Sequence, residues 1–443
     1  MSNIELALWS FPVLIALVLL RAPIALAMIA VGVGGSYLVT GTPLMVLNQL
    51  KTLTFGTFSN YSFSIIPLFL LMGQFATMSG MSASLFRAAA SFLGHRRGGV
   101  AMSAVAACAG FGAICGSSLA TAATMGQVAL PELRRYGYPG SLATGALAAG
   151  GTLGILIPPS VILVIYAILA EQNIEKLFVA ALLPGVLAAL GYMLAISIWM
   201  RRSQSDATVR DRVGWNQRMA DLTKVWPVLA IFALVVGGIY SGLFTPTEAA
   251  AVGAAATGIV ALVSGQMGWP EFKKAILATA SATAMIYMII LGAGMYNNFL
   301  ALTQLPQLAG VWVGDQGFSP WFVLIVVLAM YLVFGCIMDS LSMVLLTVPI
   351  IFPIMLTLDF GMSASDFGLW FGILVLIVVE VGLITPPVGM NLFVINSMAK
   401  DISIGQTYRG ALPFVLTDLV RVMLLAAFPP ITLALVWLID SFA

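Results

Sequence analysis

The stretch GTLGILIPPS, from Gly151 to Ser160, places two adjacent prolines near the middle of a long apolar run. No charged residue occurs between Arg135 and Glu171. Proline has no backbone donor and its ring clashes with the preceding turn, which costs about 3 kcal/mol in a helix interior. A helix broken inside a bilayer leaves carbonyls that no water satisfies. The stretch therefore indicates either a simple kink or a place where backbone oxygens are offered to a ligand.

The composition of the whole chain is typical of a membrane protein. Of its 443 residues, 61% are hydrophobic and 8% are charged, whereas soluble domains carry about 25% charged residues. Apolar runs long enough to span a bilayer recur along the chain, so we expect an all-α polytopic membrane protein. The formal net charge of +2 gives no reason to expect nucleic-acid binding. Cys108, Cys115 and Cys336 lack metal-ligand spacing and are predicted to be buried apolar residues.

We expect about 10 transmembrane helices from these runs. They are predicted at 4–20, 23–41, 62–84, 141–170, 177–200, 226–244, 247–267, 274–300, 367–397 and 411–438. With both termini in the periplasm, the cytoplasmic loops are 85–97, 134–140, 201–225, 268–274 and 398–410. Of the 19 Lys and Arg residues, only Lys51, Lys176 and Arg421 then fall outside the cytoplasmic loops and span ends. Because positive charge favours the cytoplasmic side, this bias sets the orientation.

The chain repeats itself. FGAICGSSLATAAT (111–124) aligns with FGCIMDSLSMVLLT (334–347), and GILIPPSVIL (154–163) aligns with GLITPPVGMN (382–391). The prolines Pro158 and Pro159 therefore correspond to Pro386 and Pro387. We predict a first repeat at 1–200, a cytoplasmic connecting segment at 201–225 and a second repeat at 226–443. Since each half has an odd number of spans, the second must be inverted, and inverted repeats with paired helix breaks are typical of secondary transporters.

Two further apolar blocks, 98–133 and 320–358, are predicted to be re-entrant hairpins. Val100 to Cys115 gives only about 24 Å of helix, which is less than the roughly 30 Å of a hydrocarbon core. A polar tip follows, and the chain then returns to charged residues at Arg134 and Arg135. Non-helical backbone at this depth is tolerated only inside protein or beside a water-filled cavity. We therefore expect two hairpin tips and two broken spans to meet at the centre, which favours a ligand site over a pair of kinks.

Several long motifs resemble a known transporter family. They are IPLFLLMGQFA (66–76), GSSLATAATMG (116–126), GGTLGILIPPS (150–160), FTPTEAAAVGA (244–254), MDS (338–340), LLTVPIIFP (345–353) and EVGLITPPVGMNLFV (380–394). Together they resemble the large membrane subunit, the DctM-type permease, of tripartite ATP-independent periplasmic (TRAP) transporters. The resemblance implies an elevator-type, sodium-driven symporter in the bacterial inner membrane that imports small organic acids such as a C4-dicarboxylate, sialic acid or a 2-oxo acid.

The resemblance also implies a scaffold domain, a transport domain and two partner proteins. The first three spans would form the scaffold of the first repeat, and the spans at 226–300 would form that of the second. Each hairpin would form the transport domain with the spans that follow it, 141–200 and 367–438. A small four-helix membrane subunit (DctQ-type) and a periplasmic substrate-binding protein (DctP-type) are the implied partners. Because the chain begins directly at its first span, the four-helix subunit is expected to be a separate polypeptide.

Sodium, the implied coupling ion, prefers oxygen ligands, and unwound carbonyls at half-helix ends supply them. We expect the first sodium site at Gly112, Ser117, Gly154, Ile157 and Ser160. By the repeat, the second site is expected at Gly335, Ser340, Gly382, Thr385 and Val388. For any one of these residues a packing role is equally compatible, because small residues also let helices approach closely. No organic cofactor is expected.

The substrate carboxylate is expected between the hairpin tips, where half-helix N-termini offer free N–H groups. The candidate substrate-binding residues are Ser118, Thr121, Asp339, Ser342 and Asn391. Asp339 is either such a functional carboxylate or part of an internal structural pair, since a buried carboxylate is costly unless it is paired. Glu380, which aligns with Thr152, either caps backbone donors or takes part in ion coupling. Asp418 and Arg421 are expected to neutralise each other.

Other functions fit the sequence less well. A serine-type intramembrane protease would need a histidine, but His95, the single one, lies in a basic loop. An aspartyl type would pair Asp339 with Asp418 in the last span. No Walker A sequence is present, so ATP hydrolysis on this chain is not expected. We therefore expect no enzyme, and the remaining alternatives are a channel or another secondary carrier of the same inverted-repeat type.

Overall fold

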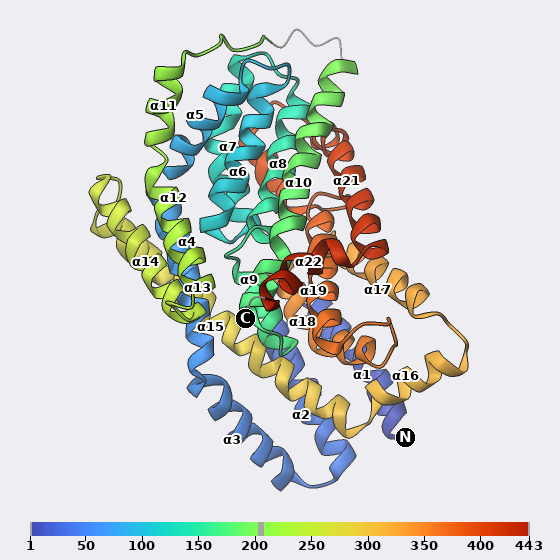
Figure 1. Ribbon diagram of the computed structural model, residues 1–443. Helices are drawn as coiled ribbons and strands as arrows, with labels where there is room; N and C mark the ends of the chain where they lie inside the picture. Colours follow the sequence, from blue (N-terminus) through green and yellow to red (C-terminus); the bar gives the residue numbers. More distant parts are fainter. Residues whose placement is uncertain (1, 203–207, 442–443) are drawn as a thin grey trace.

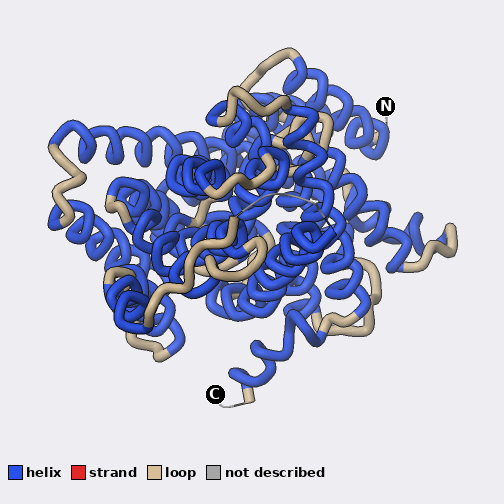
Figure 2. The backbone as a smooth tube through the Cα atoms, turned by 90° about the horizontal axis from the view of Figure 1, so that it is seen from above, coloured by secondary structure: helices blue, strands red, loops and turns tan. Residues whose placement is uncertain are grey.

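The structure is a computed structural model that describes residues 2–202 and 208–441. Every regular element in these residues is a helix, as Figure 2 shows. The first half contains α1 (Asn3–Leu19), α2 (Ile24–Thr40), α3 (Pro43–Ser59), the 3-10 turn η1 (Tyr61–Ser64), α4 (Ile65–Met78), α5 (Met81–Leu93), α6 (Gly99–Cys115), α7 (Ser118–Arg135), α8 (Gly140–Leu156), α9 (Val161–Leu169) and α10 (Ile174–Arg202).

The second half repeats this order. It contains α11 (Trp215–Thr223), α12 (Trp226–Phe232), the π-helical turn η2 (Ala233–Gly237), α13 (Gly238–Tyr240), α14 (Pro246–Val263), α15 (Trp269–Leu302), α16 (Leu305–Asp315), α17 (Pro320–Gly335), α18 (Ser340–Leu356), α19 (Ala364–Gly382), α20 (Met390–Met398), α21 (Ile404–Ala427) and α22 (Pro430–Asp440). The helix pairs α6–α7 and α8–α9 correspond to α17–α18 and α19–α20. The long helix α15 takes the place of both α3 and α4.

The fold is that of an all-helical polytopic membrane protein, as the composition predicts. Six of the described helices are long and apolar enough to cross a membrane, or eight if two bent pairs each count as one span. One bent pair is α8 with α9, which meet at 48°. The expected spans 4–20 and 23–41 form the helices α1 and α2 of 17 residues each. At about 1.5 Å per residue these helices are near the shortest that can cross the bilayer core, which explains the lower count.

Both hairpins fold back to the end from which they start. The backbone N–H of Val100, at the start of α6, donates to Tyr138 Oη beyond the end of α7 at 3.2 Å. Trp321, at the start of α17, packs edge-on against Phe360 beyond the end of α18, with ring centroids 5.7 Å apart. Neither helix pair therefore crosses from one end of the molecule to the other.

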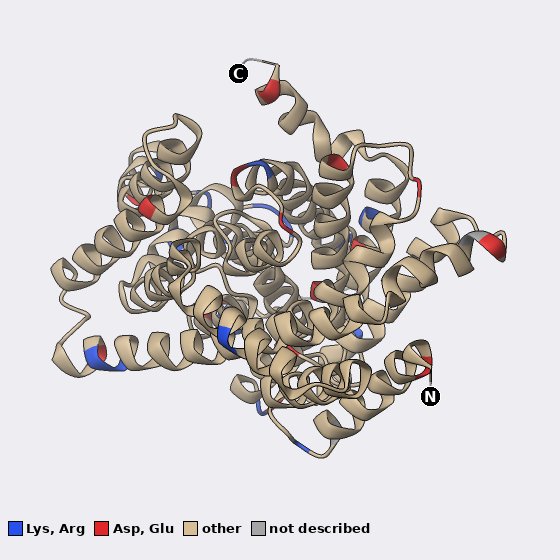
Figure 3. Cartoon of the chain, turned by 90° about the horizontal axis from the view of Figure 1, so that it is seen from below, with Lys and Arg blue, Asp and Glu red and all other residues tan. Residues whose placement is uncertain are grey.

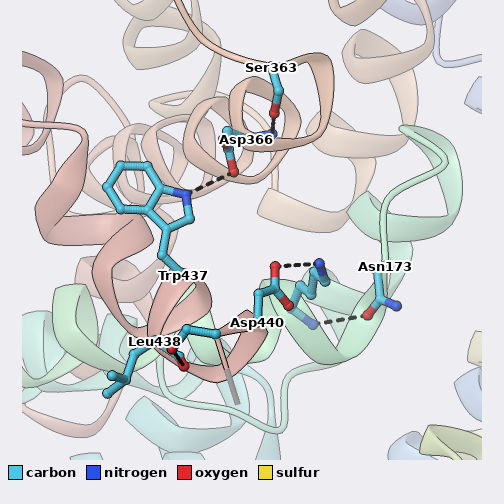
Figure 4. Close-up of polar contacts among 8 residues, drawn as sticks. Asn173, Ser363, Asp366, Trp437, Leu438 and Asp440 are labelled. Carbon is cyan, nitrogen blue, oxygen red and sulfur yellow. Dashed lines mark hydrogen bonds and ion pairs between the residues drawn. The ribbon is translucent and has the colours of Figure 1, made fainter. Parts of the chain in front are cut away.

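The two halves run in opposite directions. Arg134, just before α8, pairs with Asp401, which follows α20, so α8 begins where α20 ends. Gln172, just after α9, lies against Gly368 at the start of α19. Lys176 of α10 and Asp440 of α22 form an ion pair of 2.6 Å, drawn in Figure 4 beside the contact between Trp437 and Asp366. The broken helices α8–α9 and α19–α20 are therefore antiparallel.

The loop before α6 and the loop after α7 lie at one end of the molecule, at the top of Figure 1, beside the described residues that precede α11. There the backbone N–H groups of Thr208 and Arg210 donate to the carbonyls of Tyr136 and Gly94, at 3.0 and 3.2 Å. Figure 3 shows how few charged residues lie along the helices themselves. The contacts of Thr208 and Arg210 with the loops 85–97 and 134–140 agree with the assignment of these segments to one side of the membrane.

The sequence missed four helices. The expected span 62–84 ends at Met78, and the separate helix α5 then begins at Met81. Neither α3 nor α16 falls in an expected span, and α11 lies within the segment expected to be a polar connection. In α11, the Arg218 guanidinium stacks over Phe92 of α5 at 5.7 Å from the ring centroid. These helices are short or weakly apolar, so hydrophobic run length does not detect them.

We predict the membrane sidedness of these loops from the hairpin geometry. Cysteines introduced as Arg97→Cys and Arg134→Cys should both resist an impermeant maleimide in intact cells, because both flank the first hairpin at the basic end. Lys176→Cys, at the opposite end, should be labelled and serves as the matched control. The three native cysteines are buried and add little background. Labelling of Arg97→Cys and Arg134→Cys from opposite sides would contradict a re-entrant hairpin.

Candidate functional site

The first hairpin meets the first helix break through two glycines. A Cβ atom on Gly112 of α6 would lie 2.4 Å from the Cα atom of Gly154 in α8. A Cβ atom on Gly154 would lie 2.6 Å from Thr121 Oγ1 and 2.9 Å from the Ser117 carbonyl oxygen, both at the start of α7. Any side chain at these two positions would push the hairpin away from the break, so glycine is required here for close backbone approach.

The first break leaves backbone oxygens without their helical partners. Pro158 and Pro159 have no N–H to donate to the carbonyls of Gly154 and Ile155, four residues earlier. Ile157 is extended, with φ −92° and ψ 116°, and ends α8. Ser160 is fully buried and caps α9 by accepting from the Leu163 N–H at 3.4 Å. The break therefore combines free carbonyls with a buried hydroxyl, an oxygen-rich set of the kind that a hard cation prefers.

The second half repeats this geometry. A Cβ atom on Gly382 of α19 would lie 2.5 Å from the Cα atom of Gly335 in α17. Gly389, at φ 64°, starts α20, and its N–H donates to the Cys336 carbonyl at 3.2 Å. A Cβ atom there would lie 3.1 Å from the Thr385 carbonyl oxygen. The four glycines expected from the repeat thus form two equivalent backbone contacts, one in each half.

The two breaks differ in exposure and in partners. Pro158 and Pro159 are buried, whereas Pro386 and Pro387 are exposed. Tyr408 of α21 places its hydroxyl 2.7 Å from the Pro387 carbonyl oxygen and 2.9 Å from that of Val388. The Val388 carbonyl expected to bind sodium therefore already shares one proton with its neighbour, although each carbonyl keeps a second lone pair. Sequence reasoning missed Tyr408, which lies 20 residues from Val388.

Three of the expected ligands also start helices. Ser117 caps α7 by accepting from the Ala120 N–H at 3.4 Å, as Ser160 caps α9. Asp339 caps α18, its carboxylate accepting from the Ser342 N–H at 3.0 Å. Asp339 is partly exposed rather than deeply buried. Its carboxylate therefore has a structural partner in the backbone, as in an ordinary N-cap.

The candidate substrate residues lie in four kinds of place. Thr121 packs against Gly154, among the residues of the first expected sodium site. Ser342 lines a cleft of 370 Å³ between α18 and the helices α2 and α15. Asn391, at the start of α20, donates from Nδ2 to the Ala148 carbonyl of α8 at 3.2 Å. Ser118 and Asp339 occupy the two hairpin tips.

Several buried polar atoms of the hairpins and broken helices have no partner in the part of the chain that the structure describes. Among the described residues, Thr121 Oγ1, Asn391 Oδ1 and both carboxylate oxygens of Glu380 are buried without a hydrogen-bond partner. Buried polar groups in proteins are nearly always satisfied by protein or by water. All three residues belong to the hairpins or to the broken helices.

A further polar cluster joins the two halves. Arg421 and Asp418 form the expected ion pair, with their side chains 2.8 Å apart. Tyr192 of α10, which the sequence analysis did not single out, donates to Asp418 Oδ2 at 2.5 Å and lies 3.0 Å from Thr152 Oγ1. The cluster therefore links α8, α10 and α21 by hydrogen bonds through buried side chains.

We predict that the glycine contact is essential for packing of the hairpin. Gly112→Ala should destabilise the protein by about 1–3 kcal/mol, the usual cost of overpacking, because the methyl group meets backbone that cannot move aside. The matched control is Gly405→Ala, where a Cβ atom meets nothing within 4 Å. Thermal unfolding of the two purified variants provides the comparison. Equal stabilities would contradict the requirement for glycine.

The family model of the "Tripartite ATP-independent periplasmic transporter, DctM component" matches residues 11–431. A C4-dicarboxylate TRAP transporter large permease protein DctM of Pseudomonas aeruginosa is 39% identical, over 86% of this chain and 87% of the relative. The C4-dicarboxylate TRAP transporter large permease protein DctM of Rhodobacter capsulatus is 33% identical, over 97% of this chain and 98% of the relative. An isethionate TRAP transporter permease protein, DctMQ, of Oleidesulfovibrio alaskensis is 30% identical, over 91% of this chain and 62% of the relative.

The fold is also similar to that of a solved transporter. The crystal structure of the YdaH transporter of Alcanivorax borkumensis matches with a TM-score of 0.63 at 15% identity, covering 96% of this chain and 98% of that one. This likeness concerns the fold alone. The family is one of transport permeases, so the expectation that the chain is not an enzyme is confirmed. By the match along nearly its whole length, the chain belongs to the DctM component family of tripartite ATP-independent periplasmic transporters.

Proposed function

We propose that this chain is the large permease subunit of a sodium-coupled importer of a small carboxylate, with C4-dicarboxylates as the first candidates. The observation that carries the proposal is the pair of equivalent contacts between a hairpin and a broken helix, Gly112 with Gly154 and Gly335 with Gly382. Paired breaks in antiparallel halves provide two oxygen-rich sites, an arrangement typical of secondary transporters.

Sodium suits these sites because both are built mainly from neutral oxygens. The first would use the residues around Gly154 and Ser160, and the second those around Gly382 and Thr385. Thr385 donates its hydroxyl proton to the Val381 carbonyl at 2.6 Å. Its oxygen lone pairs are then oriented and available for a cation.

A carboxylate substrate suits the hairpin tips. Helices α7 and α18 both begin there, so their first N–H groups and positive dipole ends are close together. The relatives in Pseudomonas aeruginosa and Rhodobacter capsulatus carry C4-dicarboxylate in their names. We assign Ser118, Asp339, Ser342 and Asn391 to substrate binding, and Thr121 to the boundary between the substrate and the first sodium ion.

An elevator movement is compatible with the way the helices pack, because they form two groups whose members contact mainly one another. The helices α2, α4, α14 and α15 pack on one another, while the hairpins and broken helices pack mainly among themselves with α10 and α21. The cleft beside Ser342 lies at the boundary between these two groups. In our proposal the first group is a scaffold and the second moves past it as one body with its ligands.

The proposed assembly has three components, as the family's tripartite description suggests. A DctQ-type small membrane subunit would cover part of the scaffold, and a relative named DctMQ supports this partner. A DctP-type binding protein would deliver the substrate from the periplasm. The chain would lie in the bacterial inner membrane with both termini in the periplasm, the orientation that the clustered arginines favour.

We predict that succinate uptake in proteoliposomes requires sodium, the small subunit and the binding protein together. An imposed sodium gradient should support uptake without ATP, because the chain has no nucleotide-binding sequence. Replacing sodium by choline at constant ionic strength is the control. Undiminished succinate uptake in sodium-free buffer would refute the coupling. Saturation of the rate with substrate distinguishes a carrier from a channel.

The helix breaks and their side chains should contribute differently to sodium affinity. Thr385→Ala removes one side-chain oxygen, a loss of about 1–3 kcal/mol for a single polar group. Pro158→Ala and Pro386→Ala should lower sodium affinity more, because an N–H restored at either position lets the helix continue and withdraws several carbonyls. The sodium dependence of uptake measures all three variants. Wild-type dependence in proline variants that insert normally would mean that the breaks are only kinks.

A further inference from the structure

Glu380 is the buried charge that the proposed mechanism leaves unexplained. It lies in α19, two residues before the glycine contact of the second break, and its exposure is 1%. Both of its carboxylate oxygens lack a hydrogen-bond partner among the described residues. An unpaired carboxylate inside a membrane protein is costly, so residues of this kind mark functional sites.

The surroundings of Glu380 come from both hairpins. The hydroxyls of Ser118 and Ser340 lie beside its carboxylate without reaching hydrogen-bonding geometry. Ser118 is the first residue of α7 and Ser340 the first residue of α18. Glu380 therefore lies beside the first residues of both α7 and α18, at the tips of the two inverted hairpins.

The charged groups facing Glu380 do not neutralise it. Asp418 and Arg421 of α21 act on it electrostatically, but Arg421 is already paired with Asp418 at 2.8 Å. Tyr192 of α10 donates its hydroxyl proton to Asp418 rather than to Glu380. With all three ionised, the group Glu380, Asp418 and Arg421 carries one uncompensated negative charge.

The repeat makes this charge a feature of the second half alone. Glu380 corresponds to Thr152 in the alignment of the two breaks, and Thr152 is neutral and hydrogen-bonded to Tyr192 and the Ala149 carbonyl. A structural role common to both breaks would therefore not need a carboxylate. The hairpin N-termini would stabilise the anion in part, but no N–H donates to it in the described residues.

We propose that Glu380 is the charged ligand of one sodium ion, held at the contact of the two hairpin tips by its carboxylate with the hydroxyls of Ser118 and Ser340. This inference rests on the proposed sodium-coupled function and deepens it. It adds a carboxylate and a residue of the first hairpin to the second site, and it moves Ser118 from the substrate to the ion. The ion cancels the uncompensated charge and adds a direct link between the two hairpin tips.

The test counts sodium ions bound to the purified complex of the chain with its small subunit, using equilibrium binding of radioactive sodium. Glu380→Gln keeps the shape of the side chain and removes its charge, so binding should fall by about one ion per chain, since one carboxylate balances one monovalent cation. Glu132→Gln, an exposed acid at the end of α7, is the matched control and should bind as many ions as the wild type.

The outcomes separate the inference from the proposed function. A wild-type complex that binds no sodium refutes the proposed function itself. A wild-type complex that binds sodium, with an equal number of ions bound to Glu380→Gln, overturns the assignment of Glu380 alone. Uptake driven by a pH gradient without sodium, and lost in Glu380→Gln, also overturns it, because the carboxylate would then carry a proton.

A second variant keeps the test decisive if Glu380→Gln does not fold. The double change Ser118→Ala and Ser340→Ala removes two neutral ligands and retains the carboxylate. Sodium should then raise the thermal unfolding temperature of this complex less than that of the wild type, and half-maximal stabilisation should need more sodium. An unchanged sodium response in this folded double variant overturns the proposal.

Discussion

The constraint on which the structure depends is that broken backbone inside a membrane must either be enclosed by protein or line a water-filled cavity. Pro158 and Pro159 interrupt the first broken helix, and Pro386 and Pro387 the second, so carbonyls in both halves lose their helical donors. Each break is covered by a hairpin that approaches at a glycine pair, Gly112 with Gly154 and Gly335 with Gly382. The hairpin contacts are thus equivalent in the two antiparallel halves, although the prolines of the first break are buried and those of the second are exposed.

Two contrasting kinds of buried polar group occur in the interior, a cluster whose members contact one another and one carboxylate without a partner in the described part of the chain. Thr152, Tyr192, Asp418 and Arg421 are joined by a continuous set of short contacts, in which Arg421 contributes an ion pair but no hydrogen bond. A pairing of this kind costs desolvation and gains little stability, but it fixes the relative positions of the helices that carry it. Glu380 lies next to this cluster and stays outside it. The same region therefore contains a buried ion pair held by Tyr192 and one carboxylate with no hydrogen-bond partner among the described residues.

The sequence predicted the features that repeat or that depend on long apolar runs. The double prolines, the glycines and the pairing of Asp418 with Arg421 follow from local chemistry and spacing. The helices α3, α5, α11 and α16 were missed because they are short or amphipathic and stabilised by packing. The contacts of Tyr192 with Asp418 and of Tyr408 with Val388 join residues far apart in sequence. Exposure at each site was also beyond prediction, because it depends on how the two halves pack.

The two helix breaks differ in solvent exposure, although the sequence repeat relates them. The sequence repeat alone would make both breaks equivalent, yet the prolines of the first are buried and those of the second are exposed. In an inverted-repeat carrier, exchanging the conformations of the two halves turns a structure open to one side into one open to the other. Alternating access by such a carrier therefore requires that two halves related by the repeat adopt different conformations at any one time. Tyr408, which bonds the carbonyls of Pro387 and Val388, has no bonding counterpart at the buried break in the described residues. Its hydroxyl stabilises the exposed break in this conformation.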